Sequence, residues 1–229
     1  MLNSSNYQWL KTDDGSYTIY RKDLDEIYHS RAGALSECQH VYLKPFIEHL
    51  KNKEQTTWRV LDVGFGLGLN WLSYVSYFLE NLPGTQLEIY SIENDLTILD
   101  LPQNDHQETS KAHELLQALK QFSIVEQGNI KARLIIENLD EALDEFAQRK
   151  MLFDVILFDP FAPKKNPECW TEIMFKKLAA CAQPGALLST YSVARPVCNA
   201  LEQTGFVVEK RPGFGTKREH LVAFYQKKR

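Results

Sequence analysis

Hydrophobic residues along this chain fall into short apolar runs that alternate with longer stretches of helical periodicity. The runs are rich in β-branched and aromatic residues and predict seven strands, which span residues 58–63, 87–93, 132–137, 153–159, 186–192, 206–211 and 220–226. In most of the gaps apolar residues recur every three or four positions, as in 68–82 and 171–183. This alternation predicts βαβ units and therefore a mostly parallel sheet in an α/β fold.

The connection between the last two predicted strands differs from the others. Residues 212–219 read PGFGTKRE, and this stretch is too short and too rich in glycine to form a helix. Strands joined by so short a loop pair antiparallel. We therefore expect a sheet of six parallel strands and one antiparallel strand, the last.

The first 50 residues contain no βαβ unit. Two alternating segments, 7–12 and 17–22, flank a turn at 14–15 and predict a hairpin, and the second half of 25–50 has helical periodicity. We expect residues 1–50 to form an extension that packs on a core domain of residues 51–229, so that the whole is one globular unit.

The composition predicts a globular cytoplasmic protein. Hydrophobic residues make up 44% of the 229 positions, and no apolar run approaches the roughly 20 residues that span a membrane. The start of the chain lacks the basic and apolar regions of a signal peptide. The cysteines form no C-x-x-C pair and have no histidine at metal-ligand spacing, so we expect reduced structural thiols and no metal site; they are Cys38, Cys169, Cys181 and Cys198.

Charge is distributed unevenly along the chain. The net charge is −4, but residues 1–150 carry 14 basic and 23 acidic residues, whereas residues 151–229 carry 12 basic and 7 acidic residues. A basic final third on an acidic protein fits an electrostatic footprint for nucleic acid. Solvated helix faces explain the same counts, and composition alone leaves both interpretations open.

Three glycines alternate in LDVGFGLGLN, residues 61–70, directly after the first predicted strand. Gly64, Gly66 and Gly68 let the backbone turn sharply and approach a ligand at the carboxyl ends of the strands. A dinucleotide-binding loop would need glycine at 69, where the chain has Leu69. The spacing is instead similar to that of class I methyltransferases that use S-adenosyl-L-methionine (AdoMet), which predicts AdoMet as the cofactor. A glycine turn without a ligand is the alternative.

Two further positions extend this predicted cofactor site. Glu93 ends the second strand 29 residues after Gly64, where a carboxylate accepts hydrogen bonds from both hydroxyls of a ribose. At the end of the third strand an acidic residue often meets the adenine amino group in this superfamily. The chain offers Asn138 there, with Asp140 beginning the next helix, and an Asn carbonyl accepts the same hydrogen bond. Whether Asn138 or a neighbour makes this contact stays open.

Residues 157–171, LFDPFAPKKNPECWT, form the most specific motif. A buried strand brings Asp159 to the sheet edge beside the glycine loop, and Pro160 holds it extended with its carbonyl free. Acceptors at this point suit a nitrogen nucleophile, whose lone pair they direct at a methyl group. Because an alkylammonium has no lone pair, the site must favour the neutral amine or remove its proton. A plain Asp-Pro turn at a strand end is the structural alternative.

Three motifs together resemble a known family. Residues 26–43, 159–171 and 211–224 are similar to the bacterial MnmC-type methyltransferases, and the resemblance covers nearly the whole chain. It implies a class I AdoMet-methyltransferase (Rossmann-like) fold with a seven-stranded sheet. It also implies that the chain methylates the aminomethyl nitrogen of 5-aminomethyl-2-thiouridine at the wobble position of tRNA.

The resemblance assigns roles only where the motifs match. It places Gly64, Gly66, Gly68 and Glu93 at the cofactor and Asp159 at both the cofactor and the reacting amine, as the catalytic residue. The bifunctional members of the family carry a second, flavin-dependent half that removes a carboxymethyl group first, and this chain stops at Arg229. We therefore expect a separate oxidoreductase, or direct synthesis of the aminomethyl form, to provide the substrate.

Candidate substrate contacts lie in the same three motifs and near strand ends. Basic residues suited to phosphates of the anticodon arm are Lys164, Lys165, Arg195, Lys210, Arg211, Lys217 and Arg218. Aromatic residues suited to stacking on a splayed-out uridine are Tyr28, Phe161, Trp170 and Phe214. His29 and Arg31 are candidates for touching the base or the methionine carboxylate. Each also has an ordinary structural interpretation, as a surface charge, a core aromatic or a packed histidine.

The sequence thus predicts an AdoMet-dependent N-methyltransferase of the tRNA wobble uridine. The same chemistry on a small-molecule or protein amine is the first alternative, and it predicts a narrower and less basic mouth. A non-catalytic partner of an oxidoreductase that binds RNA or AdoMet is the second.

Overall fold

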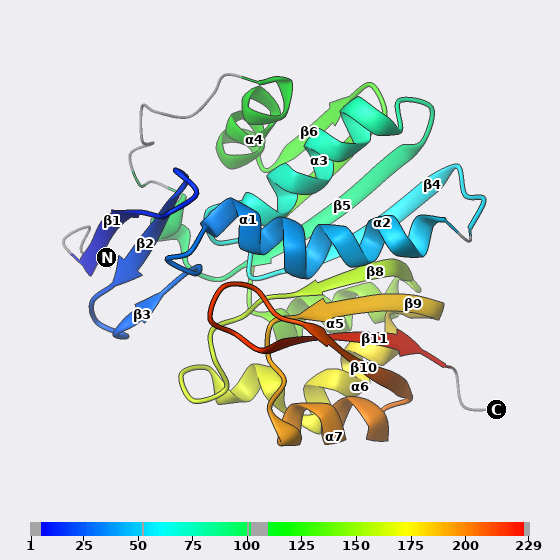
Figure 1. Ribbon diagram of the computed structural model, residues 1–229. Coiled ribbons are helices and arrows are strands. Elements are labelled where there is room, and N and C mark those ends of the chain that lie inside the picture. Colours follow the sequence, from blue (N-terminus) through cyan, green and yellow to red (C-terminus); the bar gives the residue numbers. More distant parts are fainter. Residues whose placement is uncertain (1–5, 52, 100, 102–109, 227–229) are drawn as a thin grey trace.

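The computed structural model describes residues 6–51, 53–99, 101 and 110–226. It is a three-layered α/β/α sandwich with a small second sheet at one end (Figure 1). The middle layer is an eight-stranded sheet in the order β10-β11-β9-β8-β4-β5-β7-β6. Its strands are β4 (Thr57–Val63), β5 (Gln86–Glu93), β6 (Ile124–Gln127), β7 (Ile130–Ile136), β8 (Phe153–Phe158), β9 (Ala182–Thr190), β10 (Phe206–Pro212) and β11 (Glu219–Tyr225).

The α/β class is confirmed, and all seven predicted strands are present. The count of strands needs one correction, because the apolar pattern does not predict β6. This strand has only four residues and pairs antiparallel with β7 across a turn at Gly128, whose φ is 59°. The last strand, β11, is antiparallel to both β9 and β10, as its short connection predicts. The sheet therefore has six parallel strands and two antiparallel ones.

Helices cover both faces of the sheet. Successive side chains of a strand point to opposite faces, and apolar side chains on both faces need to be buried. Trp58 and Val60 of β4 pack into one core cluster, whereas Leu61 and Val63 pack into the other. The first face is covered by α1 (Ala34–Cys38), η2 (Gln39–Leu43), α2 (Lys44–Leu50), α3 (Leu69–Asn81) and α4 (Lys111–Phe122). The second face is covered by α5 (Leu139–Gln148), α6 (Glu172–Ala180) and α7 (Arg195–Gln203). No helix among the described residues is long and apolar enough to cross a membrane.

The N-terminal segment packs against the first helical layer. Strands β1 (Tyr7–Lys11), β2 (Tyr17–Arg21) and β3 (Glu26–Ile27) form a small antiparallel sheet, which contains the predicted hairpin. From α2, Phe46 contacts Trp58, Tyr74 and Phe78, with ring centroids 5.0–5.7 Å apart. These buried rings fix the segment on the core. The domain division at residue 50 stays a prediction, and residues 1–5 of the predicted extension lie outside the described residues.

Strand β4 lies at the point where the winding of the sheet reverses. The chain continues from β4 to β5 on one side, and β8 lies on the other side, with all three parallel. Their carboxyl ends therefore leave a crevice between them, which is where α/β sheets of this kind bind ligands. The glycine loop starts at this crevice.

Asp62 is an unusual residue in the centre of β4. Its side chain is fully buried; Oδ2 accepts a hydrogen bond of 2.8 Å from Ser91, whereas Oδ1 has no partner among the described residues. Burial raises the pKa of Asp62 to about 7. The folded protein thus holds a proton that the unfolded chain has lost, so stability falls as pH rises from about 4 to about 7.

We expect Asp62→Asn to remove this part of the pH dependence. Asn has a similar shape and no charge to bury. As the pH increases from about 5 to about 8, the free energy of unfolding of the variant should therefore rise by about 1–3 kcal/mol relative to that of the wild type. Urea unfolding of both proteins across this range measures the difference. Parallel stability curves for the two proteins would contradict the assignment.

Candidate active site

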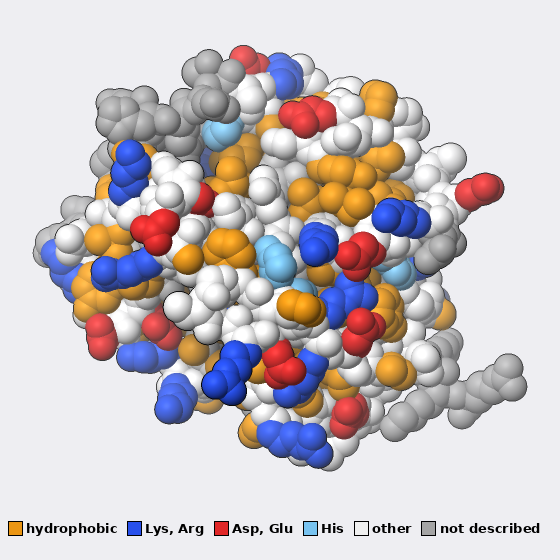
Figure 2. Space-filling view, in the orientation of Figure 1, with side chains coloured by type: hydrophobic (Ala, Val, Ile, Leu, Met, Phe, Trp, Pro, Cys, Tyr) orange, Lys and Arg blue, Asp and Glu red, His pale blue; other side chains and the backbone are white. Residues whose placement is uncertain are grey.

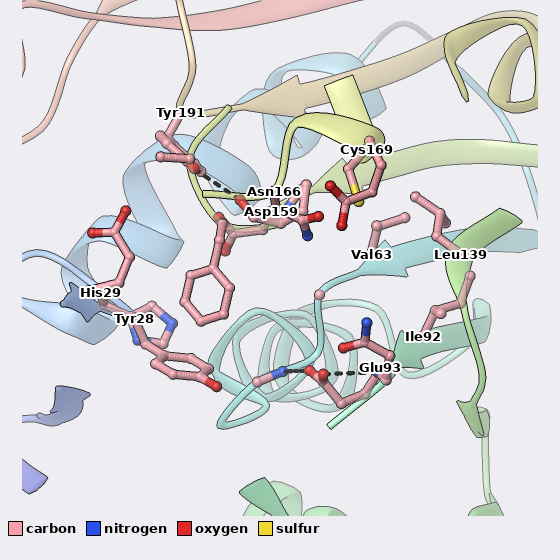
Figure 3. Close-up of a pocket in the computed structure, with 18 of the residues that line it drawn as sticks. Tyr28, His29, Val63, Ile92, Glu93, Leu139, Asp159, Asn166, Cys169 and Tyr191 are labelled. Carbon is pink, nitrogen blue, oxygen red and sulfur yellow. Dashed lines mark hydrogen bonds between the residues drawn. The ribbon is translucent and has the colours of Figure 1, made fainter. Parts of the chain in front are cut away.

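A cavity of about 1290 Å³ opens at the carboxyl ends of β4, β5, β7 and β8. The segment from β2 to α1 closes one side of it, and the start of α6 contributes to the other. Figure 3 shows Tyr28 and His29 on one side, Glu93 and Leu139 on the other, and Asp159 between the two groups. Ligand pockets typically measure about 300–1,000 Å³, so this cavity has room for more than one small molecule.

The glycine loop brings the ends of two strands into direct contact. At Gly64 φ is 82°, and a Cβ built there would lie 2.6 Å from the carbonyl oxygen of Asp159. The N–H groups of Gly64 and Phe65 both donate to the carbonyl of Ile92, at 3.1 Å. Only glycine satisfies both the left-handed conformation and the close approach. The ends of β4, β5 and β8 are thereby joined at this single turn.

The other two glycines have different surroundings. Gly66 has a φ of 52° and lines the cavity beside the ring of Tyr28. Gly68 precedes α3 with a φ of 82°, and a Cβ there would meet Phe65 and Leu116. The structure does not bring Gly68 into the cavity lining, so its contact is with the core.

Glu93 lies at the end of β5 with its carboxylate held by the backbone. Oε2 accepts from the N–H of Gly66 at 2.8 Å, and Oε1 accepts from the N–H groups of Asn94 and Asp95 at 2.9 and 3.0 Å. Burial raises its pKa, and the three N–H groups oppose this shift. A carboxylate has about four acceptor positions, so the group remains able to accept from a ligand hydroxyl in the cavity.

Asp159 follows β8 and is held from both sides. The Tyr42 hydroxyl donates to Oδ1 at 2.5 Å, and the Asn70 amide donates to Oδ2 at 2.9 Å. Burial raises the pKa of Asp159 to about 7, the negative charge of Glu37 adds to this, and the two donors oppose it. Each carboxylate oxygen keeps a second lone pair, so Asp159 is an oriented acceptor beside the glycine loop.

Aromatic rings and a cation surround the space beyond Asp159. The rings of Tyr28 and Phe161 meet edge to face, with centroids 4.9 Å apart. The Tyr191 hydroxyl donates to the carbonyl of Pro160 at 2.9 Å, and the ammonium of Lys217 lies 4.6 Å from the Tyr191 ring centroid. Lys217 also donates to Glu37 at 2.8 Å. These residues form an apolar frame with one charged edge.

His29 and Arg31 both line the cavity. The Nδ1 of His29 lies 3.2 Å from the hydroxyl oxygen of Thr18, and burial lowers the pKa of His29 to about 4. The ring is therefore neutral at physiological pH and adds no charge to the cavity. Arg31 is exposed at the rim.

Asn138 lies at the opposite end of the cavity. Its amide donates to Glu141 at 3.3 Å, and both residues line the cavity together with Leu139 and Asp140. The carbonyl of the Asn138 side chain has no partner among the described residues that would prevent it from accepting. Trp170 of the same motif lies in the core, where its indole N–H donates to the carbonyl of Phe161 at 2.8 Å.

Eight predicted substrate residues lie outside the cavity lining: Lys164, Lys165, Trp170, Arg195, Lys210, Arg211, Phe214 and Arg218. Among them, Lys164 and Arg218 are exposed, Arg218 directly follows the lining residue Lys217, and Phe214 packs against His40 with ring centroids 5.9 Å apart. Any contact that they make is therefore with the part of a substrate that projects from the cavity.

Four residues that matter in this geometry were not singled out by the sequence. Tyr42 and Asn70 fix Asp159, Glu37 pairs with Lys217, and Tyr191 holds Pro160. Asn70 had a detectable signal, because it is the only polar residue in the first turn after the glycine loop. The others come from segments that are distant from Asp159 in the sequence, so the sequence does not show that they lie near it in the fold.

Comparison with known proteins agrees with this geometry. The model of a family described as S-adenosyl-L-methionine-dependent methyltransferase matches residues 102–226. The tRNA 5-methylaminomethyl-2-thiouridine biosynthesis bifunctional protein MnmC of Leptospira interrogans is 34% identical, over 91% of this chain and 34% of its own length. Its counterpart in Idiomarina loihiensis is 32% identical, over 88% and 36%. The crystal structure of MNMC2 from Aquifex aeolicus has a TM-score of 0.82 and 27% identity, over 97% and 71%.

A Rossmann-like sheet with this glycine turn, an acidic residue at the end of the next strand and Leu69 in place of a third dinucleotide-loop glycine is typical of AdoMet-dependent methyltransferases. The chain belongs to the family of S-adenosyl-L-methionine-dependent methyltransferases that its sequence matches. The resemblance to MnmC-type methyltransferases is confirmed, and AdoMet is the cofactor. The chain spans about a third of the length of the curated relatives named above.

The residues of the cavity fit AdoMet. The turn at 64–66 leaves no room for a side chain where the cofactor's methionine part would approach, and Glu93 offers acceptor oxygens for the ribose. Leu139 and Ile173 add apolar side chains to the cavity lining, and Asn138 adds an amide. When bound, AdoMet supplies an electrophilic methyl group.

We expect Gly64→Ala to weaken AdoMet binding at least about tenfold and to destabilise the protein by about 1–3 kcal/mol. The added methyl would collide with the Asp159 carbonyl and strain the left-handed backbone. Calorimetric titration with AdoMet and urea unfolding measure the two effects. Gly84→Ala is the matched control, because no atom lies within 4 Å of a Cβ built there. Equal affinities in the two variants would show that the turn is not part of the cofactor site.

Proposed function

We propose that the protein methylates the aminomethyl nitrogen of the tRNA wobble uridine, converting 5-aminomethyl-2-thiouridine to 5-methylaminomethyl-2-thiouridine. The observation that carries this proposal is the position of Asp159. Its carbonyl contacts the turn at Gly64, and its carboxylate is an oriented acceptor within the same cavity. An amine held by Asp159 therefore lies beside the methyl group of a cofactor bound at the turn.

Asp159 handles the amine in two ways. Its carboxylate accepts N–H hydrogen bonds, which leaves the nitrogen lone pair free to point at the methyl group. Because an alkylammonium titrates near 10.4, the amine must lose a proton before it attacks. A carboxylate with a pKa of about 7 accepts that proton more readily than an ordinary aspartate does, and loss of the proton to water serves the same end.

The rest of the cavity suits a pyrimidine that has left its stack. Tyr28, Phe161 and Tyr191 offer ring faces and edges, and His29 is a neutral polar group beside them. Stacking on aromatic side chains is the usual way in which proteins hold a splayed-out base of single-stranded RNA. The volume of the cavity supports simultaneous binding of a cofactor and a nucleoside.

The basic residues that are candidates for contacts with RNA divide into two groups. Lys210, Arg211 and Lys217 form ion pairs within the protein, and Lys165 donates to the carbonyl of Leu24 at 2.5 Å. The remaining four have no ion-pair partner in the described part of the chain: Arg31, Lys164, Arg195 and Arg218. Unpaired arginines and lysines next to a cavity suit RNA phosphates. In the view of Figure 2, Lys and Arg side chains are spread over the face of the molecule, with acidic residues between them.

The partners in this proposal are tRNA, bound through its anticodon arm, and an oxidoreductase that provides the aminomethyl group. The relatives from Leptospira and Idiomarina are named as bifunctional proteins, which supports a functional link between methylation and a second activity. A cytoplasmic location follows from a tRNA substrate and belongs to the same proposal.

Nucleoside analysis tests the proposed function. Bulk tRNA from a strain that lacks this methylation should gain one methyl mass only in its 5-aminomethyl-2-thiouridine after incubation with the protein and AdoMet. The control reaction contains Asp159→Asn, which replaces one acceptor oxygen by an N–H₂ donor and removes the charge that orients the amine, and we expect its rate to fall at least about 100-fold. Methylation of small or protein amines, with no change in tRNA, would favour the first alternative function. Absence of any methyl transfer by a protein that binds AdoMet would favour a non-catalytic partner.

The unpaired cations give a second prediction. Replacing Lys164, Arg195 and Arg218 together by alanine should raise KM for tRNA about 3–10-fold. It should also reduce the slope of log affinity against log salt by about 2–3, because each lost phosphate contact removes about 0.7–0.9. The affinity for AdoMet should not change. The matched control replaces three exposed lysines near the opposite ends of the strands, namely Lys51, Lys131 and Lys150. Equal effects in the two triple variants would indicate non-specific charge attraction.

A further inference from the structure

The helix that begins at Ala34 is interrupted by a wide turn next to the cavity. Its dihedral angles remain helical from α1 to α2, but residues 39–43 form the π-helical segment η2. Pro45 supplies a local reason, since it has no N–H and its ring would collide with the carbonyl of Val41, four residues earlier. Single π-turns within α-helices frequently mark functional sites.

The side chain that this turn directs into the site is Tyr42. It is 2% exposed, and its hydroxyl donates to Oδ1 of Asp159 at 2.5 Å. The backbone carbonyl of Tyr42 accepts from the Tyr74 hydroxyl at 3.1 Å, which fixes the turn from the side of α3. Tyr42 thus reaches Asp159 from a buried and doubly anchored position.

The second oxygen of Asp159 is held in the same way by a different element. Asn70, in the first turn of α3, is 4% exposed and donates to Oδ2 at 2.9 Å. Two fixed donors, one on each oxygen, hold the carboxylate plane in one orientation. They also favour the ionised form, because a carboxylate accepts both hydrogen bonds more strongly than a neutral carboxyl does.

We propose that Tyr42 is a positioning residue of the methyl transfer: its hydroxyl, directed by the π-turn, orients the Asp159 carboxylate and keeps it in the acceptor form that binds the substrate amine. This proposal rests on the function proposed above. The Tyr42 hydroxyl keeps its own proton, so no bond is made or broken at Tyr42 during the reaction. The remaining lone pairs of Asp159 are the ones available to the amine.

Other charged and titratable groups also face Asp159. They are Cys38 and Glu37 from α1, Lys217 from the loop between β10 and β11, and Tyr191 from the end of β9. Glu37 and Lys217 have opposite charges and are paired at 2.8 Å, so their effects on Asp159 offset each other in part. Burial keeps the thiol of Cys38 and the phenol of Tyr191 neutral by raising the pKa of each. Tyr42 and Asn70 therefore provide the direct hydrogen bonds that hold the carboxylate.

The test compares the wild type with Tyr42→Phe by two measurements. Loss of a hydrogen bond to a charged group should move the acidic limb of kcat/KM for aminomethyl-uridine tRNA upward by roughly 1 pH unit or more. The ¹³C signal of the Asp159 carboxyl, assigned by its absence in Asp159→Asn, should titrate at a correspondingly higher pH in the cofactor-free protein. Tyr90→Phe is the control, because this ring packs against Phe146 and Phe153 on the other face of the sheet.

A second variant covers the case in which Tyr42→Phe unfolds. Difluorotyrosine at position 42 keeps the ring and makes the hydroxyl a stronger donor, so both midpoints should move to lower pH. Unchanged titration of Asp159 in the folded variants, with an active wild type, would overturn the role of Tyr42 and leave the proposed function intact. If the wild type is inactive on this tRNA but the Tyr42 variants still shift the titration of Asp159, the proposed function is refuted and only the hydrogen bond is confirmed.

Discussion

The structure depends on one close contact, between the turn at Gly64 and the carbonyl of Asp159. A side chain at position 64 would occupy the place of that carbonyl, and the left-handed backbone there excludes most other residues. The contact joins the end of β4, where we propose that the cofactor binds, to the end of β8, which precedes Asp159, the acceptor that we propose for the amine. Two functions that we assign to different sequence motifs are thereby brought together in space at this turn.

The N-terminal segment completes the site that this contact creates. Its rings anchor it on the core through Phe46, and its helix carries Tyr42 and Glu37 to the acceptor and the cavity wall. The cavity therefore exists only where the segment and the sheet are packed together. The loop between β10 and β11 adds Lys217, which ties the last hairpin to the same helix. Long-range packing, rather than any single motif, determines the shape of the site.

Much of the fold follows from the sequence because its signals are local. Buried parallel strands read as continuous apolar runs, and Thr171 marks the start of α6 by accepting the N–H of Met174 as a helix cap does. Strand β6 escapes such an analysis because four residues at a sheet edge, two of them apolar, have no distinctive period. The π-turn cannot be predicted in this way either, because one additional residue in a turn changes the helical periodicity too little to be detected.

The site likewise has some residues that the sequence predicts and others that only the fold brings together. Glycine spacing and the strand-ending Glu93 are patterns within one segment, and the structure places both at the cavity. Gly68 has the same spacing but supports the core, because the chain has already turned into α3 at that point. Tyr42 and Asn70 meet Asp159 across 117 and 89 residues of sequence. Only the folded arrangement reveals contacts of that kind.

The most direct test of the central claim is a crystal structure of the protein with S-adenosylhomocysteine and a 5-aminomethyluridine nucleoside. We expect the sulfur to lie over the turn at 64–66 and the amine nitrogen to be within hydrogen-bonding distance of Asp159, facing that sulfur. An amine bound elsewhere in the cavity, with Asp159 directed away from it, would contradict the account.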